Sequence, residues 1–155
     1  MASWINEALR SIRFMEYPDI TVREKFGVVS DCVNVVFRGF SEGEVEALLK
    51  GFGWMPVLIS HEAALAGGAP ILEMQYAVLP EVVRYHIRLF KFGDEIVGNV
   101  HFNRLDPAKL RRFELHGSDH ERGVQFLRRQ LDGRGVCLEE GAGGKCRIVF
   151  VSKCF

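Results

Sequence analysis

The segment from Arg84 to Asn103 alternates apolar and polar residues on both sides of Gly93-Asp94. A Gly-Asp pair between two β-patterned runs predicts an antiparallel hairpin with a two-residue turn. This register sets His86 directly opposite His101, and directly opposed side chains have Cβ atoms about 5 Å apart. Two imidazoles at that separation can share a metal ion or a proton. The hairpin therefore constrains the fold and indicates a candidate functional site at His86 and His101.

The pleat of the hairpin divides its side chains between two faces. The apolar face contains Tyr85, Ile87, Leu89, Gly98, Val100 and Phe102. The polar face contains Arg84, His86, Arg88, Asn99, His101 and Asn103, with Phe90 and Val97 beside them. We expect a further strand from Leu110 to His116, after a turn at Asp106-Pro107. Its alternation adds Arg112, Glu114 and His116 to the polar face.

This polar face suits metal binding or acid–base catalysis. Three imidazoles, from His86, His101 and His116, could bind zinc or another divalent metal and leave a coordination position for water. Alternatively, His86 and His101 could transfer protons while Glu114 orients one imidazole. His120 lies in the first turn of a predicted helix, where the dipole disfavours a cation. We expect an exposed His120, with a neutral, ligand-like His120 as the alternative.

The same face suits binding of an anion. Arg84 and Arg88 could hold a phosphate or carboxylate, with Asn99 and Asn103 as further hydrogen-bonding groups. We therefore expect the face to bind a metal ion or a small anionic ligand. Hydrolysis of a phosphate or ester bond is the reaction class that fits these groups best.

Two other interpretations of the polar face remain open. Antiparallel sheets often have one solvated face, so the polar residues could simply be the exterior of the protein. The face could also associate with a second copy of the chain, because Phe90 and Val97 lie on it. The second interpretation predicts a non-enzymatic interaction or homodimerisation module, in which this face and an N-terminal helix contact a second copy or another partner.

The remaining pattern predicts a single α+β domain over residues 1–155, with a mostly antiparallel sheet and helices packed on one face. An amphipathic helix is expected at about 3–15. Ser-x-x-Glu capping boxes begin helices at Ser41, which continues through Lys50, and at Ser118, which continues through Leu131. Extended segments are expected at 33–37, 54–59, 71–78 and 146–151. Residues 60–70 are expected to form a loop.

Composition restricts the class of protein. The 20 basic and 20 acidic residues balance, which argues against nucleic-acid binding. No apolar run is long enough to span a bilayer, and the first residues lack a secretory leader, so we expect a soluble, cytoplasmic protein. A turn at Gly141-Ala142 would oppose Cys137 to Cys146. A disulfide there is one alternative, and two buried thiols are the expectation for a cytoplasmic chain.

Several of these residues resemble the LssY C-terminal domain family. The matching features are Asp31-x-Val-Asn-Val-Val36, Gly53-Trp54, Arg84-Tyr-His-Ile-Arg-Leu-Phe90 and the segment from His116 to Arg122. The resemblance covers about residues 31–131. Tyr85 departs from it, because the family has a histidine there, and the His116 segment is shorter than in the family. The family has no established activity, so the resemblance implies the location of a site rather than a reaction.

Overall fold

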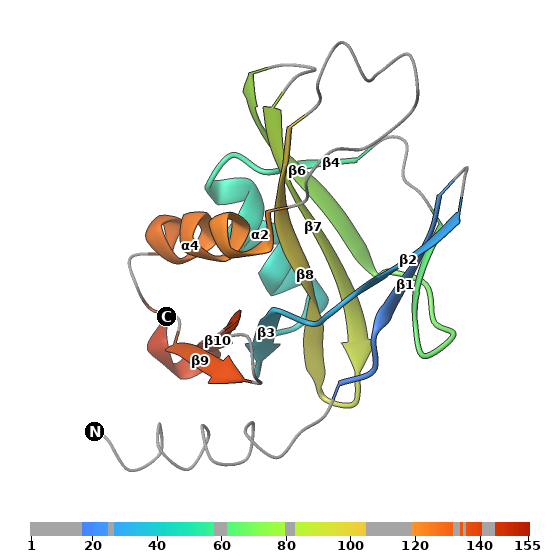
Figure 1. Ribbon diagram of the computed structural model, residues 1–155. Coiled ribbons are helices and arrows are strands. Elements are labelled where there is room, and N and C mark those ends of the chain that lie inside the picture. Colours follow the sequence, from blue (N-terminus) through green and yellow to red (C-terminus); the bar gives the residue numbers. More distant parts are fainter. Residues whose placement is uncertain are drawn as a thin grey trace.

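The computed structural model describes residues 17–24, 27–57, 62–79, 83–104, 119–131, 134, 136–140 and 145–155. Its larger sheet contains seven strands, in the order β4 (Met55–Pro56), β6 (Leu72–Leu79), β7 (Val83–Phe92), β8 (Glu95–Arg104), β3 (Val35–Arg38), β10 (Lys145–Val151) and β9 (Val136–Glu140). A smaller sheet contains β2 (Gly27–Asp31), β1 (Ile20–Glu24) and β5 (Glu62–Leu65) (Figure 1). The described strand pairs are antiparallel, except that β10 runs parallel to β3. This confirms a mixed α+β fold with largely antiparallel sheets.

Two described α-helices, α2 (Glu42–Gly51) and α4 (His120–Gln130), follow the predicted segments. The capping box of α2 is present, because the Ser41 hydroxyl accepts from the Glu44 N–H and the Glu44 carboxylate accepts from the Ser41 N–H, both at 3.1 Å. The predicted cap of α4 is wrong by one residue. Asp119 rather than Ser118 is the N-cap, and its carboxylate accepts from the Arg122 N–H at 2.9 Å.

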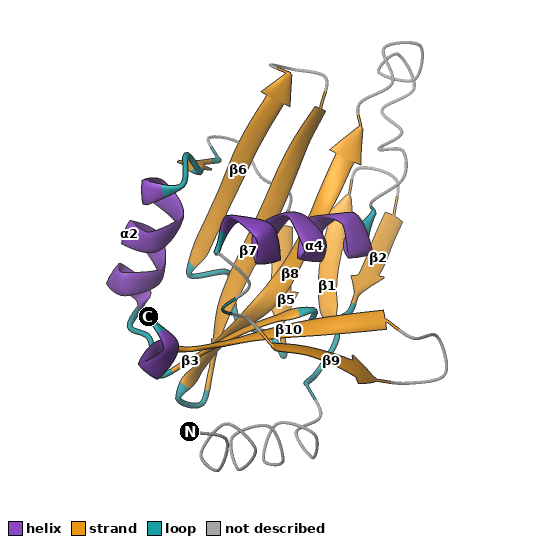
Figure 2. Cartoon of the chain, turned by 90° about the vertical axis from the view of Figure 1, so that its left-hand side faces the viewer, coloured by secondary structure: helices purple, strands orange, loops and turns teal. Residues whose placement is uncertain are grey.

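The larger sheet is covered on both faces. On one face, residues of both helices share a hydrophobic cluster with β3, β7, β8 and β10; it includes Val35, Phe37, Val45, Leu49, Ile87, Val100, Val124, Leu127 and Phe150. Figure 2 shows α4 crossing in front of the strands. On the other face, a second cluster joins the two sheets; it includes Ile20, Val22, Leu65, Val36, Phe90, Val97 and Val149. Alternate side chains along the strands of the larger sheet therefore pack into two separate hydrophobic cores.

The smaller sheet was not expected from the sequence. Residues 60–70 were expected to be a loop, but Glu62–Leu65 pairs with β1 from Ile20↔Leu65 to Arg23↔Glu62. This expectation was wrong because the strand has the sequence Glu-Ala-Ala-Leu, which lacks the β-branched and aromatic residues enriched in strands. Pairing with β1 and packing on the larger sheet override this weak local preference.

The pairing of the C-terminal strands corrects a second expectation. The register of β9 and β10 sets Cys137 opposite Ile148 and Cys146 opposite Glu139. The two cysteines are therefore not directly opposed. The expected helix at about 3–15 and the expected strand from Leu110 to His116 lie outside the described residues. Among the helices that are described, none is long and apolar enough to cross a membrane.

Candidate functional site

The hairpin has the predicted register throughout. Gly93 has a φ of 60°, and the two strands pair from Val83↔Arg104 to Phe92↔Glu95. His86 lies opposite His101, and their ring centroids are 5.1 Å apart. The turn therefore aligns the two imidazoles on one face, as the sequence predicted.

The polar face of this hairpin is buried rather than solvated. His86 is 3% exposed, Asn99 1% and His101 4%, while Arg88 and Asn103 are each 7% exposed. The interpretation that this face is merely the exterior of the protein is therefore wrong. Polar groups removed from water cost free energy unless they are paired, so their partners determine what this face does.

The apolar end of the same face is covered within the chain. Phe90 and Val97 are 1% and 0% exposed, and they pack under Ile20, Val22 and Leu65 of the smaller sheet. They are therefore not available for a contact between two copies of the chain. The smaller sheet, rather than a second copy of the chain, covers these two side chains.

Glu73 on β6 adds a carboxylate to the polar face. Its Oε2 lies 3.5 Å from both His86 Nε2 and Arg88 Nε. Both separations are longer than the usual 2.7–3.2 Å of a hydrogen bond. The contact with Arg88 is therefore a charge contact, and the contact with His86 becomes one only when His86 is protonated. Beside them, Arg84 Nη1 donates to Gln75 Oε1 at 3.0 Å. Glu73 and Gln75 were not expected at this site, although pairing the alternating residues 72–77 with β7 brings both onto this face.

Asn99 connects His101 to His120 on α4. His101 Nδ1 lies 2.8 Å from Asn99 Oδ1, and Asn99 Nδ2 lies 2.8 Å from the Cys32 carbonyl and 3.0 Å from His120 Nδ1. All three contacts are hydrogen bonds if His101 carries its proton on Nδ1 and His120 carries its proton on Nε2. His120 Nε2 then faces Asp31 Oδ1 at 3.7 Å.

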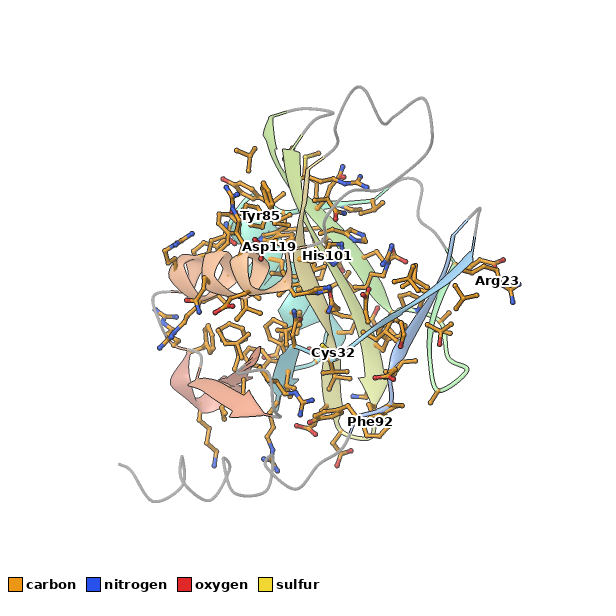
Figure 3. The ribbon with its side chains drawn as sticks, in the orientation of Figure 1. Arg23, Cys32, Tyr85, Phe92, His101 and Asp119 are labelled. Atoms are coloured by element: carbon orange, nitrogen blue, oxygen red, sulfur yellow. The ribbon has the colours of Figure 1, made fainter. Side chains whose placement is uncertain are left out.

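The start of α4 is attached to the edge of β8, which explains how His120 reaches this face. Asp119 and Phe102 exchange two backbone hydrogen bonds, of 2.9 and 3.0 Å. A Cβ on Gly123 would lie 2.6 Å from the His101 Cα, so the close packing of α4 requires glycine there. Figure 3 shows Asp119 and His101 beside each other at this junction.

Asn34 is hydrogen-bonded to the backbone of β8 close to this junction. Its side-chain amide donates to the Val100 carbonyl and accepts from the Val100 N–H, both at 2.8 Å. The side-chain amide of Asn34 thus makes the two hydrogen bonds with Val100 that the backbone of a neighbouring strand residue would otherwise make. Asp31, the Cys32 carbonyl and Asn34 all contact the site or its edge, so the segment before β3 organises the His101 end of the polar face.

Burial keeps the two facing histidines neutral. It lowers the pKa of His86 from 6.5 to about 4, although Glu73 partly opposes this effect. Burial likewise lowers the pKa of His101 well below its ordinary value, and the nearby His86 and His120 lower it further. Burial, followed by the charge of Arg88, also lowers the pKa of Arg84. At neutral pH the positive charge of this face is therefore on the guanidinium groups.

The described imidazoles form a row of three that differs from the predicted set. His101 and His120 have ring centroids 5.7 Å apart, which extends the His86–His101 pair. His120 thus joins the site rather than standing apart from it. The predicted site members Glu114 and His116 lie outside the described residues. Within the part of the chain that the structure describes, no three His, Cys, Asp or Glu residues could together hold a metal ion.

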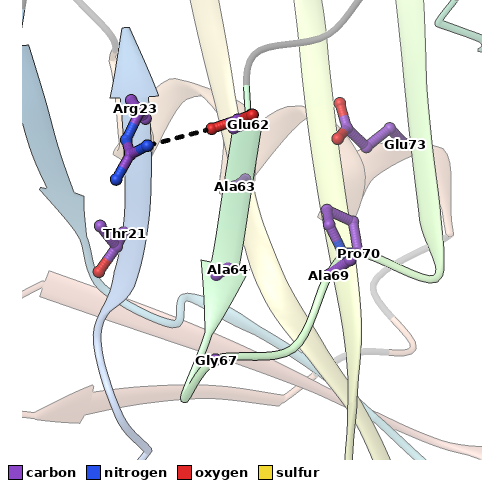
Figure 4. Close-up of a pocket in the computed structure, with 9 residues that line it drawn as sticks. All are labelled: Thr21, Arg23, Glu62, Ala63, Ala64, Gly67, Ala69, Pro70 and Glu73. Carbon is purple, nitrogen blue, oxygen red and sulfur yellow. Dashed lines mark ion pairs between the residues drawn. The ribbon is translucent and has the colours of Figure 1, made fainter.

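A pocket of about 500 Å³ lies beside this face, between the smaller sheet and β6 (Figure 4). Its lining consists of Thr21, Arg23, Glu62, Ala63, Ala64, Gly67, Ala69, Pro70 and Glu73. Arg23 and Glu62 form an exposed ion pair at 3.6 Å on its rim. Glu73 belongs to both the pocket and the polar face, so it is the residue through which the two are connected.

Comparison of the chain with protein-family models, curated proteins and solved structures found no match. The resemblance to the LssY C-terminal domain family stays a prediction. The function must therefore be inferred from the geometry of the polar face.

Proposed function

We propose that the buried polar face of β6, β7 and β8 binds a small anionic ligand. The observation that carries this proposal concerns three consecutive inward-facing side chains of β7. Arg84 Nε, His86 Nδ1 and Arg88 Nε are buried, and among the described residues none of these three nitrogen atoms has a hydrogen-bond partner; Arg88 Nε has only its 3.5 Å charge contact with Glu73. Buried polar atoms in native proteins are nearly always hydrogen-bonded, so three such nitrogens in one row indicate a missing acceptor.

The chemistry of these atoms favours an anion. The two guanidinium groups are permanent cations whose N–H groups match the oxygens of a phosphate or carboxylate. Glu73 balances one of these two positive charges at a distance of 3.5 Å from Arg88. Around His86, the described residues thus retain one positive charge, which a bound anion would neutralise. Burial strengthens that attraction, because the effective dielectric constant is lower than in water.

We further propose that the bound anion is a phosphate ester that the protein hydrolyses, with water as the nucleophile and the alcohol as the leaving group. His86 and His101 are neutral and can accept a proton, as a general base must. Glu73 contacts His86 and can stabilise the imidazolium that proton transfer would form. In this proposal Glu73 takes the orienting role that the sequence analysis assigned to Glu114.

A divalent metal held by His86 and His101 is the other ligand expected from the sequence, and it would need a third donor. Elemental analysis of the purified protein and of a His86→Ala/His101→Ala variant tests this alternative. A stoichiometric metal that is present in the wild type and absent from the variant would replace the anion proposal with a metal site.

Calorimetric titration with inorganic phosphate tests anion binding directly. We expect Arg84→Gln and Arg88→Lys to weaken binding at least ten-fold, because Lys lacks the planar donor fork of Arg. Arg129→Gln, on the exposed side of α4, is the matched control and should bind as the wild type does. Circular dichroism establishes that each variant is folded. Equal affinity in all four proteins would contradict the proposal.

A further inference from the structure

The pocket between β5 and β6 and the buried polar face share the carboxylate of Glu73. The Glu73 side chain is 13% exposed and lines the pocket, and its buried Oε2 lies 3.5 Å from His86 Nε2 and Arg88 Nε. An anion that reached Arg88 would therefore lie next to Glu73 and at the inner end of the pocket. A ligand larger than the anionic group itself would have to extend into the pocket.

We propose that the ligand is an organic monoanion, with its charged group beside Arg88 and its uncharged body in the pocket, and that Glu73 excludes dianions. This inference rests on the proposed anion-binding function and names the class of ligand. It distinguishes a phosphodiester or a carboxylate from a phosphomonoester, which carries nearly two charges at neutral pH and above.

The charge of the site supports a monoanion. Arg84 and Arg88 contribute two positive charges and Glu73 one negative charge, so one added negative charge balances the contacting residues. A second charge on the ligand would find no unbalanced cation among these contacting residues and would lie near the Glu73 carboxylate beside Arg88. We expect this to weaken the binding of a dianion at least ten-fold.

The walls of the pocket support an uncharged body. Ala63, Ala64, Ala69 and Pro70 form small, apolar surfaces behind the polar rim. The volume of about 500 Å³ lies within the range of small-molecule sites, which is about 300–1,000 Å³. Inorganic phosphate would leave this volume to solvent, whereas a ligand with an aromatic or aliphatic body would fill it.

Titration at pH 8 with diphenyl phosphate, phenyl phosphate and inorganic phosphate tests this inference. We expect the wild type to bind diphenyl phosphate, a monoanion, at least ten-fold more tightly than either dianion. Glu73→Gln should remove most of that preference by improving the binding of phenyl phosphate. Glu46→Gln is the control, because Glu46 pairs with Lys50 on α2 and lies outside both the pocket and the polar face. It should retain the preference.

Ala64→Phe tests the position of the body, because Ala64 lines the pocket and is half-buried on β5. We expect it to weaken diphenyl phosphate at least ten-fold and to leave inorganic phosphate unchanged. Phosphate binding that depends on Arg88, but with no preference for the monoanion, would overturn this inference and leave the proposed function standing. Failure of all three compounds to bind would overturn both.

Discussion

The two faces of the hairpin β7–β8 are equally buried and chemically opposite. Ile87 and Val100 are 0% exposed on one face, and His86 and His101 are 3% and 4% exposed on the other. Burying each large apolar side chain contributes about 1.5–3 kcal/mol to folding. Burying the polar groups costs free energy, and their partners recover only part of it. One face therefore stabilises the fold, whereas the other carries a free-energy cost that the proposed binding function would explain.

The largest effect should come from Gly98, where an added Cβ would meet the backbone of the opposite strand. A Cβ on Gly98 would overlap the Arg88 carbonyl oxygen and lie 2.8 Å from the Arg88 carbonyl carbon. Because backbone atoms cannot move aside as a flexible side chain can, we expect Gly98→Ala to lower the free energy of unfolding by more than about 4 kcal/mol. Chemical denaturation measures this change. Gly43→Ala, whose new Cβ would meet no described atom within 4 Å outside its own stretch of helix, should instead stabilise the protein by about 0.5–1 kcal/mol.

Substitutions at neighbouring positions compare the two faces directly. We expect Ile87→Ala to cost about 2–5 kcal/mol, because it leaves a cavity in the core. His86→Leu should change stability by less than about 1 kcal/mol, because an apolar side chain of similar size removes a buried polar group. Denaturation curves measure both values, and phosphate binding should be lost only in His86→Leu. Similar costs at the two positions would mean that both faces are primarily structural.

The polar face should also make stability depend on pH. Since the pKa of His86 is about 4 in the native protein and 6.5 in the unfolded chain, the unfolded chain binds more protons between these values. Stability is therefore complete above pH 6.5 and falls as the pH is lowered towards 4, by about 3 kcal/mol from this group. Chemical denaturation at several pH values measures how steeply the free energy of unfolding changes with pH. This dependence should be weaker in His86→Gln than in the wild type. An unchanged slope would show that His86 is not the group responsible.

The smallest effects distinguish the two helix caps. Ser41→Ala and Asp119→Ala should each cost about 1 kcal/mol, because each removes a side-chain acceptor at a helix N-terminus. Only Asp119 lies in the helix that brings His120 to the polar face. Phosphate affinity should therefore decrease in Asp119→Ala and stay constant in Ser41→Ala, as measured by the same titration.

The parts of the fold that were predicted from the sequence depend on local patterns. The Gly93-Asp94 turn determines the hairpin register, and the Ser41 capping box determines the start of α2. Which hairpin residues lie on the polar face was predicted from the alternation of strand side chains alone. The burial of that face could not be predicted, because it depends on contacts between residues distant in sequence, such as Leu65 with Phe90. Glu73 was missed for the same reason, since its role depends on the pairing of β6 with β7.

The parallel pairing of β3 with β10 has a consequence for how the chain folds. β6, β7 and β8 are consecutive antiparallel strands that can pair through short connections, whereas Val35 meets Ile148 from the far end of the described sequence. Contacts of such long range form slowly, because closing a large loop costs entropy before any contact compensates for it. We expect the β6–β7–β8 meander to form early, with the segment from Asp31 to Asn34 docking late. His86 and His101 would then face each other before Asn34 forms its hydrogen bonds with β8.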